Sequence, residues 1–226
     1  RNIATGELDV PPGLDQSGHF LQLDGALGLT DKTAATLTLR QGREYQEGTD
    51  GAADLTTARL GLRTQGANKL VYGVSGGLER YVRPPQVDDD PVMSFNFSAS
   101  ADWFITEKLT FRCAGYNGTQ FSAFYPENAL EFISGWAGLG YRWKPTTVFS
   151  VRGVYRNDDY LDPVFYEGEY VDRVDDRIEG HARIDHTLPG SFLRFYLEAI
   201  YDAVDSNLDI LDYVDKRLMI GAILSY

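Results

Sequence analysis

The sequence predicts an all-β protein, namely a single antiparallel transmembrane β-barrel of about twelve strands. Three observations predict it. The chain ends on an alternating strand with a terminal aromatic residue, apolar residues recur at every second position in long segments, and the turns between these segments alternate between short and long. Each segment has about 10 to 14 residues, which exceeds the usual strand of a soluble protein and suits a tilted strand that crosses a bilayer.

The C-terminal segment is the clearest of these signals. Leu218, Ile220, Ala222, Leu224 and Tyr226 alternate with other residues up to the end of the sequence. In a barrel the last strand pairs with the first, and a final aromatic side chain lies at the membrane interface. The alternative is the last strand of a soluble sandwich, although the ends of soluble chains tend to fray. The ending resembles the C-terminal signal of bacterial outer-membrane barrels.

Period-2 segments cover most of the chain. The predicted strands are His19–Thr30, Thr33–Arg43, Leu55–Thr64, Lys69–Tyr81, Met93–Ile105, Lys108–Gly118, Glu131–Lys144, Thr147–Asp158, Asp176–Leu188, Ser191–Asp202 and Tyr213–Tyr226. Phe95 and Phe97, for example, alternate with Ser94 and Asn96. Aromatic residues lie near several strand ends, as the interfacial girdles of a barrel require. They are Tyr81, Trp103, Tyr141, Trp143, Tyr155, Tyr201 and Tyr226.

Eleven strands is an odd number, whereas bacterial single-chain barrels have an even number. We therefore expect a further N-terminal strand that this sequence lacks, and a barrel of about twelve strands. The alternative is that one predicted strand is split or overlooked, which gives ten or twelve. Residues 1–18, with prolines at positions 11 and 12, are expected to form an external loop or N-terminal extension, and residues 1–226 one domain.

The connections between strands fall into two classes that alternate along the chain. The short turns are Asp31–Lys32, Gln65–Asn68, Glu107, Pro145–Thr146 and Pro189–Gly190. The long polar segments are Glu44–Asp54, Val82–Val92, Thr119–Leu130, Asp159–Asp175 and Ala203–Asp212. Outer-membrane barrels have short periplasmic turns and long external loops, so this asymmetry favours that class over a soluble sandwich.

Composition narrows the function classes. The net charge of −12 argues against binding to nucleic acid, which requires a basic face. The acidic residues concentrate in the turn-rich segments, where they are expected to be solvated. The chain has one cysteine, Cys113, so no internal disulfide can form. Its position in the alternation is apolar, which suggests a small residue facing lipid.

If the apolar set faces lipid, the opposite set faces the lumen and is heavily charged. An arginine on the lipid face at the bilayer midplane costs roughly 2–4 kcal/mol, so the charged positions are assigned inward. The predicted lumen-lining residues are Arg40, Arg59, Arg63, Arg112, Arg142, Arg152, Arg156, Glu179, His181, Arg183, Asp185, Arg194 and Glu198.

Two arrangements of this set remain open. Arginines and carboxylates can pair across the lumen and close it, which describes a structural barrel. Alternatively, an excess of arginine lines a water-filled passage and favours anionic or saccharide solutes. In the second arrangement, Arg152 and Arg194 are expected to govern ion selectivity together.

No catalytic, cofactor or metal site is predicted. His181 and Asp185 share the inward face, but a ladder of satisfied polar side chains explains them equally well. His19 and His186 lie near turns without partners at ligand spacing. The acidic triplet at positions 88–90 lacks the spaced ligands of a calcium loop. The protein is therefore not expected to be an enzyme.

The glycine-rich strands, the segment Gly138–Lys144 before a tight turn, and the close from Asp205 through Asn207, Tyr213 and Gly221 to Tyr226 resemble the outer-membrane porin families of proteobacteria. Some of those barrels are similar to ones encoded beside polysaccharide-export machinery. The resemblance implies a barrel in the bacterial outer membrane, surrounded by its lipid, that acts as a channel, with a link to polysaccharide export. In the alternative of a structural barrel closed by paired charges, the protein is expected to anchor or complete a larger envelope assembly and to have protein partners there.

Overall fold

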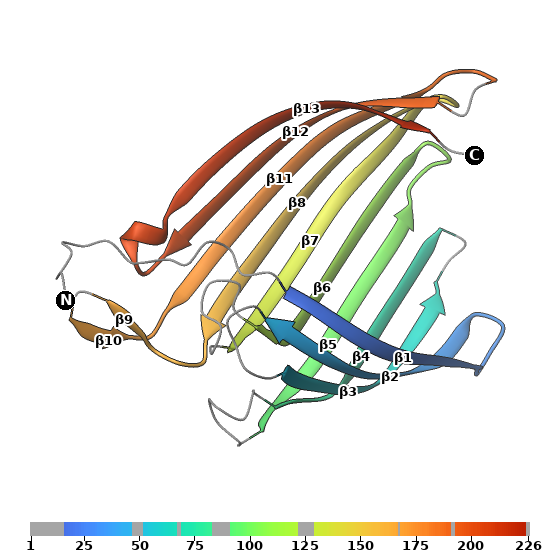
Figure 1. Cartoon of the computed structure of the whole chain (residues 1–226). Helices are drawn as coiled ribbons and strands as arrows, with labels where there is room; N and C mark the ends of the chain where they lie inside the picture. Colours follow the sequence, from blue (N-terminus) through green and yellow to red (C-terminus); the bar gives the residue numbers. More distant parts are fainter. Residues whose placement is uncertain are drawn as a thin grey trace.

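The computed structural model describes residues 16–46, 52–66, 69–82, 91–121, 129–166, 168–190 and 193–224. These residues form one eleven-stranded antiparallel sheet and a separate two-stranded hairpin (Figure 1). The strands of the main sheet are β1 (Gln16–Gly28), β2 (Thr33–Gln46), β3 (Ala52–Gln65), β4 (Leu70–Val82), β5 (Val92–Phe104), β6 (Leu109–Phe121), β7 (Ala129–Lys144), β8 (Thr147–Tyr160), β11 (Val174–Thr187), β12 (Leu193–Ser206) and β13 (Tyr213–Leu224). The hairpin consists of β9 (Val164–Tyr166) and β10 (Glu169–Val171), and a short 3-10 helix, η1 (Asp209–Leu211), precedes β13.

All eleven predicted strands are confirmed, and within the described ranges none of them is split. Their bounds shift by a few residues, mainly by extension at the ends that meet the long loops. Residues 16–18 were assigned to the external segment and instead begin β1, because they continue the ladder with β2 up to the pair Gln16–Gln46. Residues 1–15 and Tyr226 lie outside the described residues.

The sheet curls, with β1 and β13 at its two edges (Figure 1). Each strand pairs with its neighbour in the chain, except that β8 pairs with β11 across the inserted hairpin. Within the described residues no ladder joins β1 to β13. Because consecutive strands reverse direction, β1 and β13 run the same way, so an antiparallel closure needs an even strand number.

The predicted short turns are confirmed at one end of the sheet and the long connections at the other. At the turn between β11 and β12, Gly190 has a φ of 69°, which is a left-handed conformation that glycine adopts without steric cost. The hairpin β9–β10 and η1 lie within two of the long connections. We call the two ends of the sheet the turn end and the loop end.

One face of the sheet is apolar and exposed. Ile220, Leu218 and Phe95 are 80%, 71% and 62% exposed, which a water-soluble surface does not sustain over so many strands. The alternation puts Phe195, Leu197 and Leu224 on the same face, where they are also exposed, and Phe97 there is half-buried. Opposite this apolar face lies a polar face with the charged residues. Among the described residues, no helix is long and apolar enough to cross a membrane.

The substitution Leu218→Arg tests the assignment of the apolar face to lipid. Leu218 lies near the middle of β13, so an arginine there is expected to lower the free energy of unfolding in a bilayer by roughly 2–4 kcal/mol. Met219→Arg puts the same charge on the polar face one residue later and serves as the control. Urea unfolding in lipid vesicles measures both, and equal losses would contradict the assignment.

The predicted aromatic girdle is confirmed at five residues and wrong at one, and its seventh member, Tyr226, lies outside the described residues. Trp103, Tyr141, Trp143, Tyr155 and Tyr201 are all exposed near strand ends on the apolar face. Tyr81 was predicted to join them and is instead 1% exposed, because its position in β4 points it to the polar face. It packs there in a small apolar cluster at the loop end. The cluster contains Ala53, Leu55, Tyr81 and Ala129, with Val92 and Leu161 against it.

Candidate functional site

The charged residues singled out by alternation lie on the polar face of the sheet. They are Arg40 on β2, Arg59 and Arg63 on β3, Arg112 on β6, Arg142 on β7, Arg152 and Arg156 on β8, Glu179, His181, Arg183 and Asp185 on β11, and Arg194 and Glu198 on β12. Cross-strand register brings members of β8, β11 and β12 together, since His181 is level with Arg152 and Arg183 with Glu198. The set is therefore densest over these three strands.

On β11 and β12 the charges form a continuous ladder of ion pairs. The Arg183 guanidinium contacts Asp185 at 2.9 Å (Nε to Oδ2) and Glu198 at 3.2 Å (Nη1 to Oε2). Arg177 makes equivalent contacts with Glu179 at 3.0 Å and Asp202 at 2.8 Å. We call these six residues the β11–β12 ion-pair ladder. Each of its four carboxylates contacts an arginine, so this part of the face matches the arrangement expected of a structural barrel.

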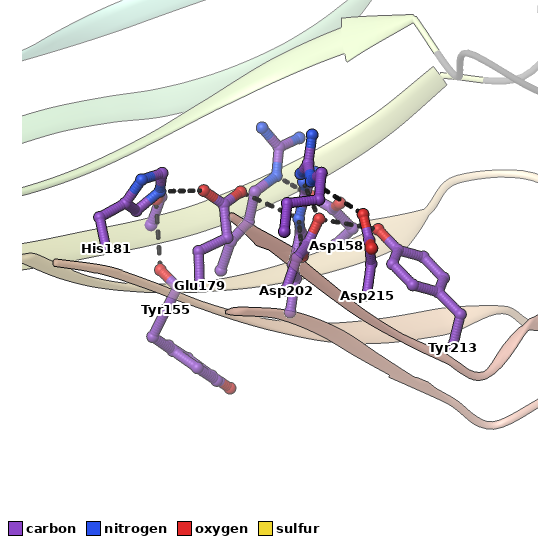
Figure 2. Close-up of polar contacts among 11 residues, drawn as sticks. Tyr155, Asp158, Glu179, His181, Asp202, Tyr213 and Asp215 are labelled. Atoms are coloured by element: carbon purple, nitrogen blue, oxygen red, sulfur yellow. Dashed lines mark hydrogen bonds and ion pairs between the residues drawn. The ribbon is translucent and has the colours of Figure 1, made fainter. Parts of the chain in front are cut away.

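His181 connects the two halves of the ladder. Its Nε2 lies 3.3 Å from Glu179 and its Nδ1 lies 3.3 Å from Glu198, so the ring bridges carboxylates of two strands. Figure 2 shows His181 directed at Glu179, with Asp202 and Tyr213 further along the same face. The Tyr213 hydroxyl donates to Asp202 at 3.3 Å. The pairing of His181 with Asp185 considered from the sequence is not present, since Arg183 occupies Asp185.

Two arginines of β7 and β8 are not paired with carboxylates in this way. Within the described ranges, Arg142 on β7 and Arg152 on β8 form no ion pair. By contrast, Arg156 on β8 contacts Asp158, and Arg112 on β6 lies 3.4 Å from Asp102. The Arg152 guanidinium instead lies over the Trp136 ring, 4.6 Å from its centroid. Positive charge therefore accumulates on β7 and β8.

Arg194 differs from the expectation. Its Nε lies 3.6 Å from Asp185 Oδ1, which places Arg194 beside a carboxylate that Arg183 already holds. The sequence analysis predicts that Arg152 and Arg194 govern ion selectivity together. In the structure Arg142, rather than Arg194, shares the uncompensated state of Arg152.

A recess of about 620 Å³ opens between the two charged regions. Its charged lining residues are Glu107, Lys108, Arg112, Arg142, Arg152, His181, Arg183 and Glu198, and Trp136 contributes a ring. Gly138 and Gly140 of β7 leave room in it, because neither has a side chain. A Cβ at Gly140 would meet no atom within 4 Å, whereas one at Gly138 would lie 3.0 Å from the Val151 carbonyl oxygen.

The recess joins opposite charges across a space that can hold a small solute. Arginines and a lysine lie on the β6–β8 side, and Glu198 with the β11–β12 ion-pair ladder lies on the other. Sequence reasoning missed Trp136 as a member of the recess, and Arg177 and Asp202 as members of the β11–β12 ion-pair ladder. Their alternation places them on the polar face, and that signal was available.

Other candidate chemistry receives no support. Among the described residues, no group of three or more histidine, cysteine or acidic side chains could hold a metal ion. The triplet at positions 88–90 lies outside those residues. His186 Nδ1 is 2.9 Å from the Thr147 hydroxyl, and His19 packs edge-on against Tyr45. Cys113 is a half-buried free thiol.

Comparison with known proteins identifies the fold. No protein-family model matches the chain, and no curated protein matches it. The solved structure of the outer-membrane channel DcaP of Acinetobacter baumannii matches 91% of the chain with a TM-score of 0.64 and 14% sequence identity. OmpT, an outer-membrane protein of Vibrio cholerae, matches 93% of the chain and 88% of its own length at 10% identity, but with a TM-score of only 0.47.

The match to DcaP shows the fold of an antiparallel outer-membrane β-barrel, as the sequence predicted. The predicted localisation in the bacterial outer membrane agrees with this fold. The chain spans 62% of the length of the DcaP channel. At 14% identity the likeness extends to the fold and not to the solute.

Proposed function

We propose that the protein is an outer-membrane channel whose polar face lines the lumen and passes small anionic solutes. The observation that carries this proposal is the state of Arg142 and Arg152, which form no ion pair within the described residues and face a recess of about 620 Å³. A cation without a carboxylate partner remains available to attract an anion, and a ring of such charges selects ions in a pore.

Saccharides form the second solute class of this proposal. The Trp136 ring lies in the recess beside Arg152 and offers a flat surface on which a sugar can stack. A role beside polysaccharide-export machinery rests on the sequence resemblance alone.

The second candidate function is a structural barrel that anchors or completes an envelope assembly. The β11–β12 ion-pair ladder favours it, since paired side chains across a lumen restrict passage. Conductance in planar bilayers separates the two functions. A stable current with anion preference is expected from the channel, and correctly folded protein that conducts nothing would favour the structural barrel.

Filling the recess tests its place in the passage. Gly140→Phe adds a ring where the added Cβ meets no atom within 4 Å, so folding is expected to be retained while conductance falls by about half or more. Gly28→Phe is the matched control, because a Cβ there also meets no atom within 4 Å, and Gly28 has the polar-face parity of Asp24 on β1, away from the recess. Equal conductance of the two variants would place the recess outside the passage.

A further inference from the structure

The interface between β5 and β6 differs from every other interface of the main sheet. Its ladder runs from the pair Phe104–Thr110 only as far as Ser98–Tyr116, although β5 begins at Val92 and β6 ends at Phe121. The neighbouring interfaces continue nearly to the strand ends, for example up to Tyr81–Val92 between β4 and β5 and Phe121–Ala129 between β6 and β7. The loop end of this interface therefore lacks backbone pairing. We call it the β5–β6 seam.

Side chains replace the backbone ladder in the seam. The Asn117 side chain on β6 acts like a peptide group: its Oδ1 accepts from the Phe97 N–H at 2.6 Å and its Nδ2 donates to the Phe95 carbonyl at 2.7 Å. In return, Asn96 Nδ2 donates to the Asn117 carbonyl at 2.9 Å. At the loop end, β5 and β6 are thus joined by hydrogen bonds of two amide side chains, those of Asn96 and Asn117.

Glu79 extends this arrangement from β4. Its Oε1 accepts from the Thr119 N–H of β6 at 2.7 Å, although β5 lies between the two strands in the sheet. Its Oε2 accepts from Thr57 at 3.1 Å and from Asn96 at 3.2 Å. Glu79 is only 5% exposed. Its side chain therefore links the four consecutive strands β3, β4, β5 and β6 across the seam.

Two strands joined by side-chain hydrogen bonds separate more easily than two strands joined by a backbone ladder. Separating two laddered strands in a membrane leaves backbone groups in lipid, which costs several kcal/mol for each. A side-chain hydrogen bond contributes less in net terms than such an exposed backbone group costs, and side chains change rotamer without moving the strand. A molecule with hydroxyl, amide or phosphate groups can also take over the bonds that Asn96 and Asn117 release.

The surroundings of the seam are apolar on one side and polar on the other. Met93 and Phe95 are exposed on the apolar face beside it, and Tyr116 is half-exposed on the polar face, edge-on to Phe132. The seam lies at the loop end, which in outer-membrane barrels is the external side. A path through it joins the lumen to the outer half of the membrane.

We propose that the β5–β6 seam is a lateral gate that admits an amphipathic molecule, with a polar head group and one acyl chain, between the lumen and the outer half of the bilayer. Glu79 holds the gate closed, because its carboxylate joins β6 to β3 and β4. This inference uses the proposal that the polar face lines the lumen, but it does not require the axial channel to select anions.

A disulfide across the seam tests the gate. In a Cys113→Ala background, Ser94→Cys and Thr119→Cys replace two hydroxyls that lie 3.1 Å apart on β5 and β6, close enough to be bridged. The matched control is Ser75→Cys with Ser98→Cys, whose hydroxyls lie 2.7 Å apart on β4 and β5, where the ladder is intact. Both proteins are placed in phosphatidylcholine vesicles with lysophosphatidylcholine that carries a diazirine on its acyl chain.

Photolabelling of Tyr116 and Phe132, read by mass spectrometry, is expected to fall about tenfold when the seam disulfide forms and to return on reduction. The control disulfide is expected to leave it unchanged, and Glu79→Gln to increase it. Equal labelling of the polar face with and without the seam disulfide would overturn the gate. Axial conductance is measured on the same samples, so a failed anion channel is distinguished from a failed gate.

A second measurement applies if the cysteine pair impairs folding. In the unmodified protein, hydrogen exchange of the Phe97 and Thr119 amides is expected to be about tenfold faster than that of Ala101 and Cys113 on the same strands. Uniform protection along β5 and β6 would overturn the gate.

Discussion

The double substitution Arg142→Glu and Arg152→Glu is expected to replace the anion preference proposed for the channel with a cation preference. Both guanidinium groups line the recess and neither forms an ion pair within the described residues, so their reversal changes the local charge by four units without breaking a salt bridge. The ratio of anion to cation permeability, obtained from reversal potentials in a salt gradient, should change on the order of tenfold or more.

The control for this experiment is a second double variant with the same net charge as Arg142→Glu with Arg152→Glu. Arg80→Glu with Lys216→Glu also changes the net charge by four units, but neither residue is on the polar face. Arg80 has the apolar-face parity of β4, and Lys216 lies over the Tyr201 ring on the apolar face. This control should leave the reversal potential nearly unchanged. If both double variants shift it equally, or if neither does, Arg142 and Arg152 do not govern selectivity.

Reversal of a paired arginine is expected to act on stability instead. Arg183→Glu would leave four carboxylates adjacent, those of the new residue, Asp185, Glu198 and Glu179, in place of a network with two bridging contacts. The side chains of Arg183, Asp185 and Glu198 are 25%, 18% and 14% exposed. Burial of this degree puts the loss in the free energy of unfolding at roughly 2–4 kcal/mol, near the lower part of the range for a broken buried ion pair.

The same reversal at an uncompensated arginine provides the comparison. Arg142→Glu alone removes no ion pair between described residues and is expected to change the unfolding free energy by less than about 1 kcal/mol. Urea unfolding in vesicles, followed by heat-dependent migration in detergent gels, measures both variants. Similar stabilities of Arg183→Glu and Arg142→Glu would show that the β11–β12 ion-pair ladder does not stabilise the sheet.

The strands could be predicted from the sequence because each has a regular alternation over more than ten residues, and the alternation also fixes which side chains share a face. The short elements could not. β9, β10 and η1 have three residues each, too few to show a period. Tyr81 was misplaced because an aromatic residue at a strand end was assigned to the girdle without regard to its parity, which is that of Glu79 on the polar face.

Whether each arginine pairs with a carboxylate could not be predicted from the sequence, because such pairs depend on the register between strands. Arg183 and Asp185 are two residues apart and could be paired from alternation, but the contact of Arg183 with Glu198 depends on the register of β11 with β12. Whether Arg152 has a carboxylate neighbour depends likewise on β7 and β11. The β5–β6 seam left one trace in the sequence: Asn117 is a polar residue at an apolar position of β6, after Phe111, Cys113 and Gly115.

The order of the ladders also has a kinetic consequence. Nearly all contacts join strands that are consecutive in the chain, so the sheet can assemble one hairpin at a time with little loop-closure entropy at each step. The β5–β6 ladder is the shortest ladder of the main sheet and divides this sheet into two blocks of consecutive strands, β1–β5 and β6–β13. The two blocks are expected to nucleate separately, and the contacts of Glu79 with Thr119 and of Asn117 with β5 are expected to form only when the blocks dock.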